Sequence, residues 1–184
     1  ITPYVTKIIT DSDYTIPEDS SINEIYLFGN GNISATGNSK DNTFLGNSGN
    51  NTYQGNGGND TIIDTEGGDD TYIYNLGDGN DTITDMDGND TIRLGEGITA
   101  NMIHMKKLPY NSNLIIYFEN QDGQIEIQNY FDESNNYKIE KIILADNTEI
   151  TNFENYMDPL TFITVDSDYT IAENSSITDV YLSG

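Results

Sequence analysis

The chain has no cysteine and no tryptophan among its 184 residues, and it has only seven lysines and arginines against 31 acids. The absence of cysteine excludes disulfides, thiolate catalysis and cysteine-ligated zinc. The formal net charge is −24, and the only adjacent basic pair is Lys106 and Lys107, so no basic face is expected to bind nucleic acid. No apolar run approaches the roughly 18 to 20 residues that cross a bilayer.

Recognisable catalytic motifs are also missing. The chain has no HExxH, no GxSxG and no glycine-rich phosphate loop with a lysine. His104 is the only histidine, and a lone histidine in a strand more often packs or lies at the surface than acts as a base or ligand. We therefore expect no enzymatic activity and assign no catalytic residue.

A nine-residue unit repeats through the first half of the chain. Six threonines, each followed by an apolar residue, are spaced by 9, 9, 10, 11 and 9 residues: Thr43, Thr52, Thr61, Thr71, Thr82 and Thr91. The word GNDTI occurs three times. Each unit has a half rich in Gly, Asn and Asp, which favours a turn, and a short Thr-apolar half, which favours a strand.

This alternation predicts an all-β solenoid in which two repeats complete one coil. Turns two repeats apart then lie on the same edge, about 4.8 Å from each other. Each short strand sends one side chain inward, and the predicted core residues are Phe44, Tyr53, Ile62, Tyr72, Ile83 and Ile92.

Stacking of the turns brings acidic side chains into register. One edge is expected to carry Asn51, Asp70 and Asp90, and the other Asp60 and Asp81. Carboxylates at this spacing repel, but with glycine carbonyls facing the same gap they form the all-oxygen cage that calcium prefers. The remaining acids of the repeats are predicted to be solvated and not ligands: Asp64, Asp69, Asp78, Asp85 and Asp87.

The repeats resemble the GGxGxDxUx nonapeptide of the repeats-in-toxin (RTX), or haemolysin-type, calcium-binding family, and residues 55–63 and 76–84 match it best. The resemblance implies a parallel β-roll, a right-handed solenoid with two to four calcium ions between its turns. It places the metal positions at Gly49 with Asn51, Gly58 with Asp60, Gly68 with Asp70, Gly79 with Asp81, and Gly88 with Asp90. Asn51 lacks the charge, so its site should be weak or empty, and residues 37–45 should form a metal-free coil.

Residues 92–105, 113–132 and 137–150 resemble the haemolysin-related segment that commonly follows such repeats. Alternating patterns predict strands over 114–118 and 124–128, with a hairpin turn at 121–123. We expect this part to cap the roll, because an open solenoid end exposes apolar surface and unpaired strand edges.

A second, longer repeat relates the two ends of the chain. Residues 11–29 return at 166–184 with thirteen of nineteen positions identical, a shift of 155 residues. We therefore expect part of a tandem-repeat protein, with 1–29 as opening strands, 30–97 as the calcium-binding β-roll, 98–155 as a β-rich cap, and 156–184 as a linker and the start of the next unit.

These features predict a calcium-dependent structural or adhesive module of a large bacterial protein. The family resemblance implies type I secretion and an extracellular or cell-surface location, with calcium and neighbouring copies of the repeat as partners. Two alternatives stay open: the calcium-binding appendage of a secreted enzyme or toxin, and a carbohydrate-binding adhesin module in which some of the thirteen tyrosines stack on sugar rings.

Overall fold

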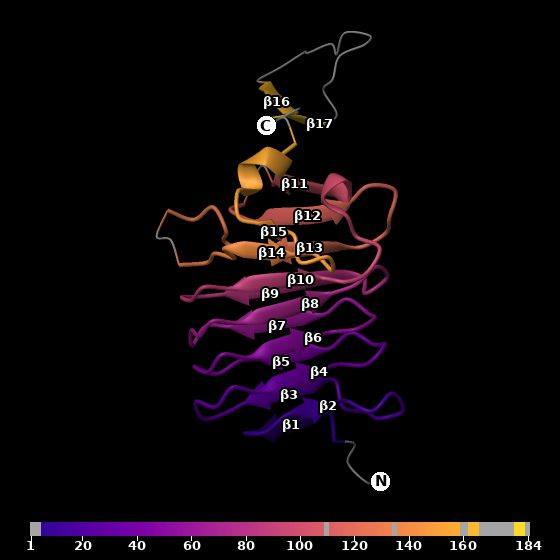
Figure 1. Ribbon diagram of the computed structural model, residues 1–184, viewed down its shortest axis with the longest axis vertical. Helices are drawn as coiled ribbons and strands as arrows, with labels where there is room; N and C mark the ends of the chain where they lie inside the picture. Colours follow the sequence, from indigo (N-terminus) through magenta and orange to yellow (C-terminus); the bar gives the residue numbers. More distant parts are fainter. Residues whose placement is uncertain (1–4, 109–110, 134–135, 159–161, 166–178, 183–184) are drawn as a thin grey trace.

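The computed structural model describes residues 5–108, 111–133, 136–158, 162–165 and 179–182. Over these residues the chain is a stack of β-coils, as Figure 1 shows, and the predicted all-β roll with a β-strand cap is confirmed. Two short 3₁₀ helices interrupt the described strands, η1 (Ala100–Met102) and η2 (Phe153–Tyr156). No helix in the described part of the chain is long and apolar enough to cross a membrane.

Two long sheets run along the stack. Sheet A has the strand order β1, β3, β5, β7, β9, β13, β12, β11, and sheet B has the order β15, β14, β10, β8, β6, β4, β2. The strands of sheet A are β1 (Lys7–Thr10), β3 (Glu24–Leu27), β5 (Thr43–Leu45), β7 (Thr61–Asp64), β9 (Asn80–Asp85), β11 (Ile103–Lys107), β12 (Leu114–Phe118) and β13 (Gln124–Ile127). The strands of sheet B are β2 (Tyr14–Thr15), β4 (Ser34–Thr36), β6 (Thr52–Gln54), β8 (Thr71–Tyr74), β10 (Thr91–Leu94), β14 (Lys141–Ile143) and β15 (Glu149–Ile150).

Strand pairing in the roll is parallel and joins repeats that are two apart. In sheet A, Thr61 lies between Thr43 and Thr82, and in sheet B, Thr71 pairs with Thr91. The chain therefore passes from one sheet to the other at each repeat, and the prediction that two repeats complete a coil is confirmed.

The core lies between the two sheets. All six side chains predicted to point inward are at most 4% exposed: Phe44, Tyr53, Ile62, Tyr72, Ile83 and Ile92. The Tyr53 and Tyr72 rings stack with their centroids 5.5 Å apart. Burial of one such side chain stabilises the fold by about 1.5 to 3 kcal/mol.

The cap first continues the two sheets and then ends their parallel pairing. β13 pairs in parallel with β9 and β14 in parallel with β10, so the cap supplies one more coil. β12 and β15 then add to β13 and β14 in antiparallel fashion, and β11 closes sheet A. The predicted hairpin lies between β12 and β13, where Gly123 has the positive φ of 96° that such a turn requires.

A third, two-stranded sheet repeats the pairing of the first coil. β16 (Phe162–Val165) pairs in parallel with β17 (Asp179–Leu182), and Phe162 lies opposite Asp179. In the first coil Lys7 lies opposite Glu24, and both positions are 155 residues earlier. The long repeat of the sequence is therefore also a repeat of strand register.

Candidate metal centre

The turns that lead into the strands form two rows along the roll. Edge A is the row that leads into sheet A, and it contains Asp60, which directly precedes β7, and Asp81, the second residue of β9. Edge B leads into sheet B and contains Asn51, Asp70 and Asp90, each just before its strand. The strand register stacks these residues as the sequence predicted.

The glycines of these turns approach one another so closely that no side chain would fit between them. A Cβ atom built on Gly79 would collide with the carbonyl oxygen of Gly58, and one built on Gly88 with that of Gly68. A Cβ atom built on Gly68 would likewise collide with the carbonyl oxygen of Gly49 on edge B. Carbonyl oxygens therefore face the gaps between stacked turns, beside the aspartates.

Each aspartate is held by the turn below it. On edge A, the Asn42 backbone N–H donates to Asp60 Oδ1 at 2.7 Å, and the Asp60 N–H donates to Asp81 Oδ1 at 3.0 Å. On edge B, the Asp70 N–H donates in the same way to Asp90 Oδ1 at 2.7 Å. One oxygen of each carboxylate thus fixes its orientation, which leaves the other to face the gap.

Two of the remaining oxygens are buried without a hydrogen bond. Asp60 Oδ2 and Asp70 Oδ2 have no partner among the described residues, although both side chains are 1% exposed. A buried carboxylate oxygen without a donor is costly, so it requires a cation or a proton. The surrounding ligand atoms are all oxygens, which fits calcium.

Electrostatics at the turns favours the same interpretation. Burial, followed by the neighbouring carboxylates, raises the pKa of Asp60 to about 8, and burial raises the pKa of Asp81 to about 7. Burial also raises the pKa of Asp70 and Asp90. The ionised fold is therefore under electrostatic strain that a divalent cation would relieve.

Asn51 differs from the aspartates in how its side chain is used. Its Nδ2 donates to the Asn47 and Gly49 carbonyls at 3.2 and 2.8 Å and to Asn47 Oδ1 at 2.9 Å, while its Oδ1 accepts from the Ile33 N–H. The Asn51 amide therefore donates hydrogen bonds to the same oxygens that a metal ion in this turn would need as ligands.

The coil formed by residues 37–45 is closed in a similar way. Asn42 accepts the Asn38 N–H at 2.8 Å and donates to Asn38 Oδ1 at 3.3 Å. Gly58 stacks on the backbone of Lys40, whose ammonium group donates to the Ser20 carbonyl. A cationic side chain at this turn fits the expectation of a metal-free coil.

The prediction that Asp64, Asp78 and Asp85 are solvated is wrong. Asp64 and Asp85 are at most 1% exposed and Asp78 is also buried, whereas Asp69 and Asp87 are exposed. The signal that could have revealed two of them is the strand alternation. Asp64 lies two residues after Ile62 and Asp85 two after Ile83, so both point inward like those core residues.

A further cluster was therefore missed by the sequence analysis. One oxygen from each of Asp70, Asp85 and Asp90 lies within 4.8 Å of the others, and all three residues are buried. Tyr72 donates its hydroxyl to Asp85 Oδ2 at 2.9 Å, and Tyr53 does the same to Asp64 Oδ2 at 2.7 Å. Burial raises the pKa of both Asp64 and Asp85.

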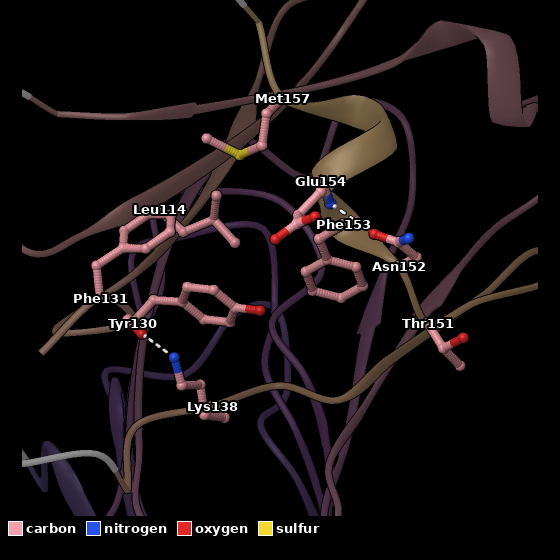
Figure 2. Close-up of a pocket in the computed structure, with 9 residues that line it drawn as sticks. All are labelled: Leu114, Tyr130, Phe131, Lys138, Thr151, Asn152, Phe153, Glu154 and Met157. Atoms are coloured by element: carbon pink, nitrogen blue, oxygen red, sulfur yellow. Dashed lines mark hydrogen bonds between the residues drawn. The ribbon is translucent and has the colours of Figure 1, made fainter. Parts of the chain in front are cut away.

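The cap has a separate cavity of about 440 Å³, shown in Figure 2. Tyr130 and Phe153 stack at its wall with ring centroids 6.1 Å apart, and Lys138 donates to the Tyr130 carbonyl at 2.7 Å. His104 lies elsewhere in the cap, against the Tyr117 ring and 3.3 Å from Asp158. None of these residues belongs to the two metal edges.

These stacked turns define the class of protein: a parallel β-roll in which carboxylate and carbonyl oxygens line the gaps between successive coils. The family model of the RTX calcium-binding nonapeptide repeat (4 copies) matches residues 28–62 and 75–98. The model of the haemolysin-type calcium binding protein related domain matches residues 113–152, which contain most of the cap. The chain therefore contains RTX calcium-binding nonapeptide repeats followed by a haemolysin-type related domain, and these repeats form a calcium-binding β-roll module. A search of curated proteins found no match.

Proposed function

We propose that the chain is a calcium-dependent structural module of a secreted or surface-layer bacterial protein, and that it folds when it meets extracellular calcium. The observation that carries this proposal is the pair of buried, unpartnered oxygens, Asp60 Oδ2 and Asp70 Oδ2, in turns where Gly58 and Gly68 direct their carbonyl oxygens at the next coil. When bound, calcium supplies the positive charge that lets these carboxylates stay ionised in the core.

The ions would lie between successive turns of each edge. The residues proposed for edge A are Gly58, Asp60 and Asp81, and those for edge B are Gly68, Asp70, Gly88 and Asp90. Gly79 belongs to edge A through its contact with the Gly58 carbonyl, but its own carbonyl oxygen already accepts the Tyr74 hydroxyl at 2.7 Å and the Gln124 N–H at 3.0 Å. This arrangement gives at least two ions, at the lower end of the range of two to four. We do not assign an ion to Gly49 and Asn51, because the Asn51 amide already occupies the oxygens of that turn.

Calcium would act as a folding switch. A compact chain with a net charge of −24 resists its own folding, and ligand binding to the folded form alone stabilises it by RT ln(1 + [L]/Kd). At tens of Kd this is on the order of 2 kcal/mol for each site. Extracellular calcium modules bind with a Kd of about 10⁻⁴ to 10⁻³ M, so the chain would stay unfolded in the cytosol, pass through a type I channel and fold outside.

The proposed architecture is a head-to-tail array of such modules that acts as a spacer or adhesive element. The equal registers of β1 with β3 and of β16 with β17 support a new roll that begins at residue 162. The first coil also exposes Val5, Ile9 and Phe28, which a preceding unit could cover. On this view residues 1–29 open the unit, 30–97 form the roll, 98–155 cap it and 156–184 begin the next copy.

A calcium titration followed by far-ultraviolet circular dichroism tests the proposal. We expect little β signal in chelator at neutral pH, a steep gain with calcium and a poor response to magnesium, which keeps its waters. A double variant, Asp60→Asn with Asp81→Asn, should show a smaller gain of β signal with calcium, because edge A loses both charged ligands and also the repulsion that calcium relieves. Asp122→Asn in the exposed hairpin loop is the control and should match the wild type. Full β structure in excess chelator would refute the proposal.

The alternative of a carbohydrate-binding module has one observation in its favour, the cap cavity with Tyr130, Phe131 and Phe153 at its wall. Aromatic faces of this kind can stack on sugar rings. Glycan binding that is lost in Tyr130→Ala, with calcium-dependent folding retained, would favour it. The remaining alternative, an appendage of a secreted enzyme or toxin, predicts a catalytic or pore-forming domain encoded beside this chain and no further copies of the unit.

A further inference from the structure

Asp85 occupies a position where the repeat pattern has glycine. The strand register places Asp85 opposite Asp64, and the Gly46 N–H donates to the carbonyl of Ile63, the residue before Asp64. Gly46, Asp64 and Asp85 therefore occupy the same position in three successive coils. The lowest of the three keeps the glycine. In the two upper coils a buried carboxylate replaces it, at the start of a turn on edge B.

Asp64 and Asp85 differ in how many of their oxygens are occupied. Asp64 Oδ2 accepts the Tyr53 hydroxyl at 2.7 Å, and its Oδ1 accepts the Glu66 N–H at 3.3 Å. Asp85 Oδ2 accepts the Tyr72 hydroxyl at 2.9 Å, but its Oδ1 has no hydrogen-bond partner among the described residues. Asp85 therefore offers a buried oxygen that its counterpart one coil below does not.

Three buried carboxylates lie close together at edge B. Asp70, Asp85 and Asp90 each contribute an oxygen to a group in which all atoms lie within 4.8 Å of one another. Calcium binds oxygens at 2.3 to 2.6 Å, so two ligands of the same ion can be separated by up to about 5 Å. Asp70 Oδ2 and Asp85 Oδ1 have no hydrogen-bond partner among the described residues, so two of the three residues in this group carry an unsatisfied buried oxygen.

We propose that Asp85 is an additional calcium ligand that gives the edge B site three carboxylates and makes it the tightest site of the roll. This inference rests on the proposed function. Edge A provides Asp60 and Asp81, and no third acid joins them in a comparable group within the described residues. Affinity in such sites rises with ligand charge, so the two edges fill at different calcium concentrations.

Tyr72 is a positioning residue in this site. Its ring is fixed by stacking on Tyr53 in the core, and its hydroxyl donates to Asp85 Oδ2 at 2.9 Å. The bond holds the Asp85 carboxylate in place and leaves its Oδ1 without a donor. Because the chain has no tryptophan, tyrosine is the main sensitiser available to a luminescent lanthanide bound there.

Calorimetric calcium titrations of the 184-residue chain and of two matched variants, Asp85→Asn and Asp64→Asn, test the proposal. Asparagine keeps the shape and the acceptor for the tyrosine hydroxyl in both variants but removes the charge. We expect Asp85→Asn to weaken the tightest binding step by about tenfold or more, and Asp64→Asn, which removes a charge beside Asp70 but no unpartnered oxygen, to weaken it by less than about threefold. Terbium emission excited through tyrosine should fall in Asp85→Asn in the same titration range.

The rival explanation is that Asp85 is a neutral, protonated acid that only bonds to its neighbours. Asparagine imitates such a group, so Asp85→Asn would then bind calcium like the wild type, and the proposal would be overturned. Equal losses in both variants, or a larger loss in Asp64→Asn, would overturn it as well. A wild-type chain that binds no calcium would instead refute the proposed function itself.

Discussion

Without calcium, the protein should become less stable as the pH rises, which is the reverse of ordinary acid denaturation. Burial raises the pKa of Asp60 to about 8 and that of Asp81 to about 7, from an ordinary value of 3.8. A carboxyl group whose pKa is higher in the folded than in the unfolded chain stabilises the fold fully at a pH below its pKa in the unfolded chain. This stabilisation is lost as the pH rises through the pKa that the group has in the folded chain. The loss therefore falls between about pH 4 and pH 8.

The size of the effect follows from these two residues. Between about pH 5.5 and pH 8.5, Asp60 should cost about 3 kcal/mol and Asp81 about 2 kcal/mol, at about 1.4 kcal/mol for each pKa unit. This is comparable to the total stability of many domains, about 5 to 15 kcal/mol. Burial raises the pKa of Asp70 and Asp90 too, which adds in the same direction.

The assay is circular dichroism of calcium-free protein across this pH range, which stays above the pI of 4.1: the β signal should be strongest near about pH 5.5 and should fall toward about pH 8.5. With saturating calcium the trend should reverse, because protons compete with the ion for the same carboxylates. Glu18 and Asp146 have a lowered pKa from hydrogen bonds with Ser39 and Thr148, so they act in the opposite sense but below this window. Calcium-free protein that is equally stable, or more stable, at pH 8.5 would refute the reasoning.

Three further predictions concern single side chains of the roll. Gly79→Ala should destabilise the calcium-loaded fold by about 2 kcal/mol or more in urea unfolding, since its Cβ would meet the Gly58 carbonyl at a φ of 106°; an unchanged midpoint would contradict the stacked turns. Asn51→Asp should cost about 1 to 3 kcal/mol in chelator at about pH 5.5, where the calcium-free fold is most stable, because two carbonyls lose their donor. It should also add one calcium ion in calorimetry at neutral pH, and an unchanged ion count would contradict this interpretation of Asn51. Ile92→Ala, at a site with 0% exposure, should cost about 2 to 5 kcal/mol in urea unfolding of the calcium-loaded fold, and an unchanged midpoint would contradict the burial of this side chain.

Local repetition is what made much of this molecule predictable. A turn-forming half and a strand-forming half that alternate every nine residues specify the same geometry at each step, so the period alone predicted the two sheets, the two edges and the inward column from Phe44 to Ile92. The positions of Asp60 and Asp81 on one edge follow from the same rule.

The tertiary structure decided what depends on neighbours rather than on period. Asp64 and Asp85 resemble other surface acids in the sequence, but the longer strands β7 and β9 carry them into the core, where tyrosine hydroxyls meet them. Asn51 resembles a weakened ligand, but the fold of its own turn makes it a donor.

The way in which the roll ends was also beyond the sequence. The alternating pattern and the turn residues predicted a cap of β-strands. They did not predict that β13 would extend sheet A or that β14 would extend sheet B. The Asp90 N–H, at the top of edge B, donates to Glu140, which is 50 residues away in the chain. The sequence by itself determined the repeating unit, because each repeat carries its own turn and strand signals. Only the packed structure decided which carboxylates lose their water and which find a donor, because burial depends on the residues that lie above and below in the stack.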